Sequence, residues 1–356
     1  MVQKNEIKRI AVRGPNWVGD TVMSVPALKL LSALFPAAEI DLLLRGSVAD
    51  LFEDADFVNS VVAIDDPGSK IRSVRENTAF LASRRYDLAV ILTNSFEPAL
   101  STLFAGIPRR IGYNKDLRGL LLTDPVPVPD WKTRRHEVFF YLHLIAEVGN
   151  RILGRPVFLE AEPDASFTLS QSRIDSALSL IKEAGVGPQK NLVAVGAGST
   201  NSRAKRWGLD RFAELCERLV DELDVSVVLL GGPNEVEIAE NLVGERPNKI
   251  IDLIGKTSVA DAAALLKQCR LLVANDMGLA HLAPAVGTKT AVIFGPTDPV
   301  TTRPFSDDAF VIREAVDCSP CMLRDCPIDH RCMTRITVDR VFAACKDLLF
   351  FRNGRL

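Results

Sequence analysis

The sequence predicts an α/β protein of two domains, each with a parallel β-sheet covered by helices. Three observations support this fold class. Short apolar runs alternate with helical patterns along all 356 residues, as βαβ units require. The apolar runs are continuous and do not alternate with polar residues, which is typical of parallel strands covered on both faces. Pro156 and Pro163 interrupt regular structure near the middle of the chain, so we expect the two halves to meet there.

The strands follow in chain order from these apolar runs. Five are expected in the first half, at residues 9–13, 39–45, 60–65, 88–92 and 109–113, and six in the second, at 191–198, 225–232, 249–255, 271–276, 290–296 and 309–313. Helical patterns such as 209–223 and 259–269 separate them. We expect Rossmann-like domains at residues 1–165 and 166–340, facing each other across a cleft, and a terminal helix at 341–356. Ligands of such sheets bind at the carboxyl ends of the strands.

Composition and charge exclude several function classes. The chain has 47% hydrophobic and 25% charged residues and a formal net charge of -2, as in a soluble globular protein and unlike a nucleic-acid binder. The first residues are polar and basic with no apolar segment after them, and no run reaches the ~20 apolar residues of a transmembrane helix. Seven cysteines, an odd number, do not suit a secreted disulfide scaffold. We therefore expect a cytoplasmic enzyme.

The segment IAVRGPNWVGDTVMSVPAL leads from the first strand through a glycine-containing turn into a helix. A dinucleotide-binding loop has the pattern Gly-x-Gly-x-x-Gly, whereas this loop has only Gly14 and Gly19, and Pro15 makes it rigid. Asp20 falls in the first turn of the helix, where the helix N-terminus stabilises an ionised carboxylate. The loop is thus expected to present a charged carboxylate, and a helix cap is the structural alternative.

Polar residues follow four strands of the second half at the points where the strands end. They are Ser199, Thr200, Lys205 and Arg206, then Glu235, then Thr257 and Ser258, and finally the segment NDMGLAHLAPAVG at 275–287. In the last segment Asp276 is expected to cap a helix that starts at Met277, and Gly278 permits close approach of the backbone to a ligand. Free N–H groups and the helix dipole favour an anion there. Each of these residues alone could be an ordinary helix cap or a solvated charge. Their joint placement at the ends of successive strands, however, predicts a ligand site.

The motifs GPNWVGD, NSFEPALSTLFAGIPRRIGY, AKRW, NDMGLAHLAPAVG and GPTDP occur in this order between residues 14 and 299. This ordered set resembles the lipopolysaccharide heptosyltransferases, glycosyltransferase family 9. The resemblance implies a GT-B fold and transfer of heptose from ADP-heptose to the inner core of lipopolysaccharide. It also implies a donor site in the second domain, an acceptor site in the first, and a terminal helix that crosses back to the first domain. Gly208 stands where the family usually has Pro after KRW.

The resemblance also assigns roles to residues. Asp20 is the expected general base, which takes the proton from the acceptor hydroxyl as that oxygen attacks the anomeric carbon. Lys205 is the second expected catalytic residue and contacts the donor phosphates. The expected donor-binding set is Ser199, Thr200, Lys205, Glu235, Thr257, Asp276, Met277, Gly278, Leu279 and His281.

No metal or other cofactor is expected for the reaction. Preorganised donors such as Lys205 supply ~3 kcal/mol each at a developing charge, so they are expected to neutralise the departing ADP. Asp54 and Asp56 form the metal-binding pattern Asp-x-Asp, but they precede the 60–65 strand, at its amino end, and are expected to be a solvated turn. One carboxylate base with no second nucleophile predicts a single displacement with inversion.

The segment from Arg109 to Arg135 carries seven basic and three acidic residues, a local charge of +4. A solvated face is the default for such a run. A lipopolysaccharide acceptor, however, carries carboxylates and phosphates at an anionic membrane surface, where each cation contributes ~1 kcal/mol. We therefore expect acceptor or inner-membrane contact from Arg109, Arg110, Lys115 and Arg118. Asn94 and Ser95, which follow the 88–92 strand, are expected to bind acceptor hydroxyls.

Four cysteines lie within fifteen residues, in the segment CSPCMLRDCPIDHRC. Their spacing allows Cys318, Cys321, Cys326 and Cys332 to bind one structural Zn²⁺, with His330 as an alternative fourth ligand. Disulfides and reduced thiols in a loop are the alternatives. A structural role is expected in each case, because the predicted chemistry is complete without this segment.

Two other function classes remain open. A nucleotide-dependent oxidoreductase fits two Rossmann-like domains, but the third Gly of its fingerprint is missing. A noncatalytic sugar-nucleotide-binding protein would bind ADP-heptose without turnover, and the presence of both Asp20 and Lys205 argues against it.

Overall fold

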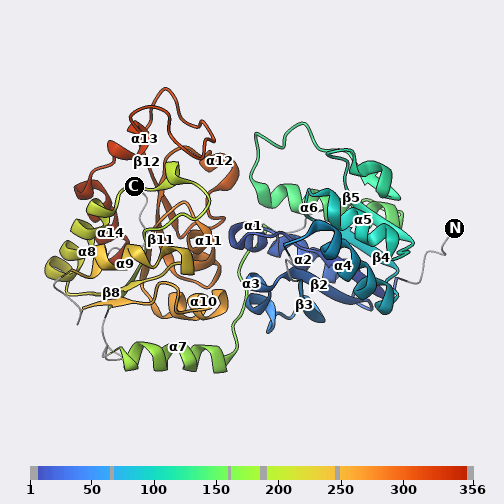
Figure 1. Cartoon of the computed structure of the whole chain (residues 1–356), viewed down its shortest axis with the longest axis horizontal. Coiled ribbons are helices and arrows are strands. Elements are labelled where there is room, and N and C mark those ends of the chain that lie inside the picture. The colour runs from blue at the N-terminus through green and yellow to red at the C-terminus, as the bar shows by residue number, and fades with distance from the viewer. Residues whose placement is uncertain (1–6, 65–67, 159–161, 185–190, 245–248, 351–356) are drawn as a thin grey trace. The chain divides into compact units, whose positions relative to one another are not determined.

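The computed structural model describes residues 7–64, 68–158, 162–184, 191–244 and 249–350. The chain forms two compact units, Met1–Ala165 and Ser166–Leu356. Figure 1 shows that each unit is built from strands with helices packed around them. Within the described ranges, no helix has both the length and the apolar character needed to cross a membrane.

The first unit contains a six-stranded parallel sheet in the order β3-β2-β1-β4-β5-β6. Its strands are β1 (Arg9–Arg13), β2 (Glu39–Arg45), β3 (Ser60–Ile64), β4 (Leu88–Ile91), β5 (Arg109–Tyr113) and β6 (Asp124–Val126). Its helices are α1 (Val18–Met23), α2 (Val25–Leu34), α3 (Gly46–Ala49), α4 (Lys70–Arg84), α5 (Phe96–Phe104) and α6 (Glu137–Leu153), with the 3-10 turns η1 (Asp50–Phe52) and η2 (Arg118–Leu121).

The centre of this sheet shows why the apolar runs become parallel strands. Val12 of β1 lies opposite Leu42 of β2 on one side and Val90 of β4 on the other. All three side chains are fully buried, and each contributes ~1.5–3 kcal/mol relative to an exposed position. Because the centre of the sheet is occupied by such core residues, Asp20 and Asn94 of the predicted sites come after the strands and not within them.

The second unit contains a six-stranded parallel sheet in the order β12-β11-β10-β7-β8-β9. Its strands are β7 (Leu192–Gly196), β8 (Ser226–Leu229), β9 (Ile250–Asp252), β10 (Leu271–Asn275), β11 (Lys289–Phe294) and β12 (Ala309–Arg313). Its helices are α7 (Gln171–Glu183), α8 (Leu209–Leu223), α9 (Glu237–Val243), α10 (Val259–Gln268), α11 (Gly278–Ala285), α12 (Pro299–Thr302), α13 (Arg331–Thr334) and α14 (Val338–Phe350), with η3 (Arg203–Lys205) and η4 (Pro233–Glu235).

Both sheets have the same doubly wound topology. The strand order reverses between β1 and β4 in the first unit and between β7 and β10 in the second. In open α/β sheets, ligands bind at the carboxyl ends of strands beside such a reversal. Asp20, in the first turn of the helix after β1, and Asn94, after β4, lie at these ends in the first unit, and Ser199 and Asp276 follow β7 and β10 in the second.

All eleven predicted strands are present among the twelve strands of the described residues. Asp65, at the end of the predicted 60–65 strand, lies outside the described residues. The additional strand β6 pairs only with β5, at the edge of the sheet. It has three residues and contains Pro125, and proline is tolerated in sheets mainly on edge strands.

Helix α14 packs within the second unit, against α8, β10 and β11. Val341, Phe342 and Cys345 on its buried face belong to the core of that unit. Residues 351–356 lie outside the described part of the chain, so the expected return of the C-terminal segment to the first domain stays a prediction.

Candidate active site

The loop between β1 and α1 is held against its own sheet. A Cβ atom on Gly14 would lie 2.5 Å from Leu44 Cδ2, so glycine allows the chain to pass close over β2. The Arg13 guanidinium donates to the Gly14 carbonyl and, at 2.6 Å, to Asn16 Oδ1. These contacts fix the direction in which the chain enters α1.

Asp20 lies in the first turn of α1 and is half-buried. The N-cap of α1 is Trp17, so Asp20 is not the capping residue. Helix α1 packs against α6. The pKa of Tyr141 on α6 is raised well above its usual value, first by burial and then by the charge of Asp20. Asp20 is therefore near a buried tyrosine at the carboxyl end of β1, and its catalytic role stays a prediction.

Asn94 and Ser95 follow β4, and the exposed Ser95 is the N-cap of α5. The Arg118 guanidinium supports this loop by donating to the Thr93 carbonyl, and its Nε donates to the Tyr113 carbonyl at 2.7 Å. Arg118 is 0% exposed, and burial lowers its pKa to about 10. It is still a cation at neutral pH, but it lies beneath the loop and not on the surface.

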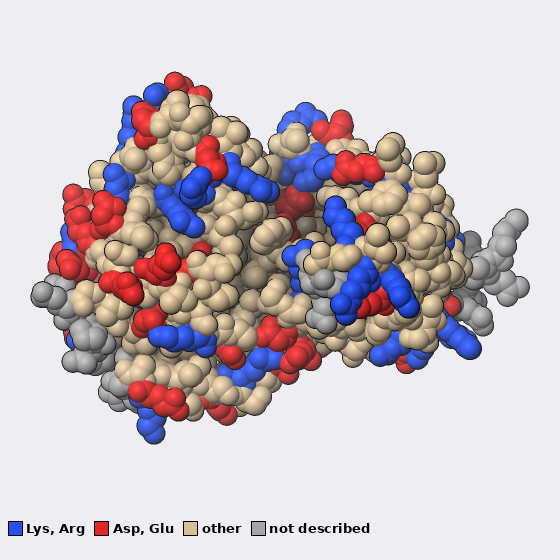
Figure 2. Space-filling view, viewed as in Figure 1, with Lys and Arg blue, Asp and Glu red and all other residues tan. Residues whose placement is uncertain are grey.

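The other cations of the predicted acceptor face are also partly engaged within the first unit. Arg109 donates to the Asp124 carboxylate at 2.8 and 2.9 Å. Arg110 donates to two backbone carbonyls at 2.6 and 2.9 Å, and Lys115 is exposed. On the face shown in Figure 2, basic and acidic side chains are interspersed. Arg109 and Arg110 are thus already engaged in contacts within the unit, whereas Lys115 is exposed.

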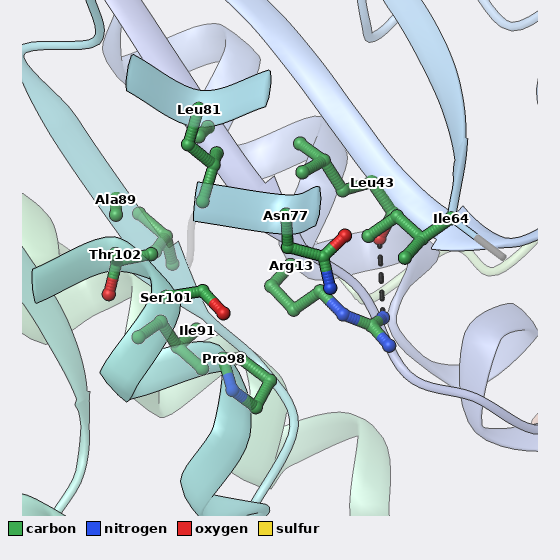
Figure 3. A pocket seen from close by; sticks show the side chains of 12 residues that line it. Arg13, Leu43, Ile64, Asn77, Leu81, Ala89, Ile91, Pro98, Ser101 and Thr102 are labelled. Carbon is green, nitrogen blue, oxygen red and sulfur yellow. Dashed lines mark hydrogen bonds between the residues drawn. The ribbon is translucent and has the colours of Figure 1, made fainter. Parts of the chain in front are cut away.

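Figure 3 shows a small cavity at the carboxyl end of β1, lined by Arg13, Asn77 and Ser101 together with apolar side chains. Its volume is about 20 Å³, which is room for one water molecule and not for a sugar. Burial lowers the pKa of Arg13 to about 10, and the charge of Glu97 opposes this effect. The cavity is therefore too small to be a substrate site.

Three polar side chains from different loops meet at the carboxyl end of β10 in the second unit. Lys205 Nζ lies 2.7 Å from Asp276 Oδ2. Thr297 Oγ1 donates to the same oxygen at 2.6 Å, and Asp276 is 4% exposed. The predicted helix cap by Asp276 is wrong, because Met277 is the N-cap of α11 and no side chain caps that helix. The carboxylate instead serves to hold a lysine.

Asn275, to which the sequence prediction gave no role, joins the loops around this group. Its side chain is fully buried. Asn275 Oδ1 accepts from the backbone N–H of Trp207 at 3.1 Å, and Nδ2 donates to the carbonyls of Ala197 at 2.8 Å and Gly198 at 3.2 Å. The ends of β7 and β10 and the chain just after Lys205 are thereby held together. An amide at the end of an otherwise apolar run is the sequence signal for this role.

Glu235 is a buried carboxylate beside the end of β7, with 3% exposure. It accepts from the Gly232 N–H at 3.0 Å and from Thr200 Oγ1 at 3.3 Å. A Cβ atom on Gly198 would lie 2.1 Å from the Glu235 carboxyl group, so glycine is needed there. Ser199, the next residue, is buried and its carbonyl accepts from Arg206 at 3.1 Å.

The remaining predicted donor residues lie at strand ends of the same unit. Thr257 is half-buried just before α10, and Gly278 and Leu279 are half-buried in the first turn of α11. His281 is 7% exposed on α11. Gly208 has φ +117°, which proline, fixed near -65°, cannot adopt. Glycine at this position therefore allows a backbone conformation that the usual proline of the motif could not adopt.

The cysteine-rich segment, residues 318–332, connects β12 to α13 and is irregular through His330. Cys318 and Cys321 are exposed, Cys326 is half-buried and Cys332 is buried, all as free thiols. Burial is the main cause that raises the pKa of Cys332, and the nearby charges of Cys318, Cys321 and Cys326 raise it further. In the described ranges, no group of three or more His, Cys, Asp or Glu side chains is arranged to hold a metal ion, and the structural zinc stays a prediction.

Comparison with known proteins identifies the family of this chain. The family described as "Glycosyltransferase family 9 (heptosyltransferase)" matches residues 75–331. The chain belongs to glycosyltransferase family 9. It is 30% identical over 319 residues to the lipopolysaccharide heptosyltransferase 2 of Escherichia coli K12, covering 86% of this chain and 88% of the relative.

Solved structures support the same assignment. The E. coli ADP-heptose lps heptosyltransferase II is 29% identical with a TM-score of 0.80, over 96% of this chain and 98% of that chain. A family 9 enzyme from Veillonella parvula, 20% identical, has the same fold with a TM-score of 0.85 over 98% of both chains. The family 9 chain is thus a glycosyltransferase with a GT-B fold, as its motifs predicted. The oxidoreductase and noncatalytic alternatives are set aside.

Proposed function

We propose that this family 9 enzyme is a heptosyltransferase II, which transfers heptose from ADP-L-glycero-D-manno-heptose to the inner-core heptose of lipopolysaccharide. The observation that carries the proposal is the Lys205–Asp276–Thr297 group at the carboxyl end of β10, where a doubly wound domain binds its ligand. The similarity to the E. coli enzymes named lipopolysaccharide heptosyltransferase 2 and ADP-heptose lps heptosyltransferase II supports the substrates.

The proposed chemistry is a single displacement. The acceptor hydroxyl gives its proton to the Asp20 carboxylate while its oxygen forms a bond to the anomeric carbon of heptose. The bond from that carbon to ADP breaks, and its electron pair leaves with the diphosphate. Because one displacement occurs, the anomeric configuration is inverted.

Lys205 is proposed to stabilise the charge that develops on the departing diphosphate. Asp276 holds Lys205 Nζ at 2.7 Å, so the cation is positioned before the reaction and needs no reorganisation. The N–H groups at the start of α11 add a positive field nearby. These groups are proposed to make the reaction independent of divalent metal. Asp54 and Asp56, the Asp-x-Asp pattern, are exposed in a turn before β3, as predicted.

The acceptor is proposed to bind the first unit at the carboxyl end of β4. Asn94 and Ser95 are proposed to bind the hydroxyls of the acceptor. Arg109, Arg110 and Lys115 are proposed to attract its anionic groups. We propose that the enzyme works on the cytoplasmic side of the inner membrane as a peripheral protein. Since Arg109 already pairs with Asp124, Lys115 is the cation we expect to contribute most.

The direct test is incubation with ADP-heptose and a defined core acceptor, followed by mass measurement of the product. The proposal expects the acceptor to gain one heptosyl residue. Asp20→Asn should lower kcat by ~10²–10⁴ with nearly unchanged ADP affinity, as loss of a general base does. Asp56→Asn, an exposed acid in the same unit, is the control. Turnover of the Asp20 variant at the wild-type rate would remove Asp20 from the mechanism.

The donor side has a separate test. Lys205→Ala should weaken ADP binding and slow transfer about 100-fold, the effect of losing one preorganised donor. Lys249→Ala, which removes a half-buried lysine paired with the exposed Asp224, is the matched control. Full activity in EDTA is expected, and a strict requirement for Mg²⁺ or Mn²⁺ would contradict the metal-free chemistry.

A further inference from the structure

The cysteine-rich segment contacts two of the three loops that present the Lys205–Asp276–Thr297 group. One loop is residues 202–205, which contains η3 and ends in Lys205. The other is residues 295–297, which follows β11 and ends in Thr297. The proposed reaction gives the segment no role, so these contacts need a separate explanation.

The first set of contacts holds the Lys205 turn. The Arg324 carbonyl accepts from the Ala204 N–H at 2.9 Å and from Ser202 Oγ at 3.1 Å. His330 Nε2 lies 2.6 Å from the Ala204 carbonyl oxygen, so the ring nitrogen donates to it. The N–H and the C=O of Ala204 are thus both bonded to the cysteine-rich segment, one residue before Lys205.

The second set of contacts holds the Thr297 loop. The Pro296 carbonyl accepts from the backbone N–H groups of Cys321 at 3.0 Å and Met322 at 2.8 Å. Ser319 Oγ donates to the Gly295 carbonyl at 2.5 Å. A Cβ atom on Gly295 would lie 3.3 Å from Cys332 Sγ and closer still to the next side chain, Met333. The loop is therefore bonded and packed against the segment at consecutive residues.

The internal bonds of the Lys205 turn are longer than those that Ala204 makes to the segment, and the shorter of them joins the Arg206 N–H to the Arg203 carbonyl at 3.1 Å. Within the turn, the Lys205 N–H donates to the Ser202 carbonyl at 3.3 Å, longer than the bonds that Ala204 makes to the segment. A three-residue 3-10 turn also has few hydrogen bonds of its own. The position of Lys205 consequently depends on what the turn is bonded to.

We infer that the cysteine-rich segment is a brace that positions the donor-binding group, and that His330 is a positioning residue for Lys205. By holding Ala204 and Pro296 at the same time, the brace sets where Lys205 and Thr297 meet the Asp276 carboxylate. A shift of the first loop would separate Lys205 from Asp276, and a shift of the second would separate Thr297 from the same carboxylate. The inference deepens the proposed function and rests on it for the identity of the ligand, the diphosphate of ADP.

The test compares ADP binding by calorimetry in the full-length wild type and three variants. His330→Ala removes the bond to Ala204 and should weaken ADP binding about 3- to 10-fold, the range expected for loss of one net hydrogen bond. His330→Gln keeps an N–H donor and should recover most of the affinity. Asp329→Asn is the matched control, because Asp329 pairs only with its neighbour Arg331 on the surface in the contacts described. Thermal unfolding of each variant establishes that it is folded.

A double-mutant cycle with Lys205→Ala separates positioning from general stability. If His330 acts through Lys205, His330→Ala should change ADP affinity less than twofold in the Lys205→Ala background, because coupled residues are not additive. Additive effects would overturn the inference, as would a His330→Ala affinity equal to that of Asp329→Asn, or a His330→Gln affinity as low as that of His330→Ala. A wild-type chain that does not bind ADP would instead refute the proposed function, so the two failures are distinguishable.

Discussion

Replacement of Arg118 by methionine tests whether a buried cation supports the acceptor loop. The change keeps an extended side chain and removes the guanidinium. Arg118 donates to the carbonyls of Tyr113 and Thr93 and is 0% exposed, so no water can replace the lost donors without rearrangement. The first unit should therefore become less stable, and the loop that carries Asn94 and Ser95 should become less ordered.

The magnitude follows from the two carbonyls left without a donor. Each buried unsatisfied group costs about 1–3 kcal/mol, which gives about 2–6 kcal/mol for two. Burying the Arg118 cation is itself unfavourable, which is why burial lowers its pKa to about 10. Methionine removes this cost, which offsets part of the lost stability. We therefore expect a loss of about 3 kcal/mol, or about 6–12 °C in the Tm of the first unit at 2–4 °C per kcal/mol.

Differential scanning calorimetry of Arg118→Met and Lys115→Met measures this effect. Lys115 is exposed three residues earlier, so its replacement removes the same charge without the buried bonds and should leave the Tm within about 1 °C. Equal Tm values for the two variants would refute the supporting role. If Arg118→Met kept its stability and only raised the KM for the acceptor, Arg118 would be an acceptor contact, as the sequence analysis expected.

Three further outcomes are expected. Thr297→Val removes the hydroxyl that donates to Asp276 at 2.6 Å and should raise the KM for ADP-heptose about tenfold, whereas Thr301→Val should not; steady-state kinetics measures both. Burial lowers the pKa of His143, and the charge of Glu147 opposes this effect. Because the folded-state pKa is depressed, the stability that the neutral ring contributes is present above the unfolded pKa of about 6.5 and is lost as the pH falls through the folded value. His143→Phe should therefore flatten the decline in Tm between pH 7 and 5, and an unchanged slope would contradict this reasoning. Elemental analysis of protein purified without chelator tests the cysteine-rich segment: a zinc content below about a tenth of an equivalent would rule out the structural metal.

The strands were predictable because each is encoded locally. A continuous apolar run such as residues 88–92 has few ways to bury itself other than as a covered parallel strand, and β4 lies there at Leu88–Ile91. Strand β6 was missed since three residues with a proline carry no such signal. The positions of Asp20 and Asn94 followed from the same rule, because strand ends are where parallel sheets place polar side chains.

The contacts of the candidate site were not predictable in the same way. Asp276 was expected to cap a helix, but its partners, Lys205 and Thr297, are distant in the chain and meet it only through the fold. Arg118 was expected on a basic face, but Asp116 and Leu117 have positive φ values of 52° and 62°, and the chain turns so that the arginine points inward. Such turns of ordinary residues are uncommon and have no sequence signature of their own.

The two environments of the cysteines make the chain suited to selective labelling. Burial raises the pKa of Cys216 and Cys269 to about 12, so these thiols remain protonated and react slowly near neutral pH. Cys318 and Cys321 are exposed and lie in the segment bonded to the donor loops. A maleimide fluorophore added to the native, reduced chain should therefore attach there first. If ADP binds at the proposed donor site and moves these loops, we expect the fluorescence to change, with no cysteine added or removed.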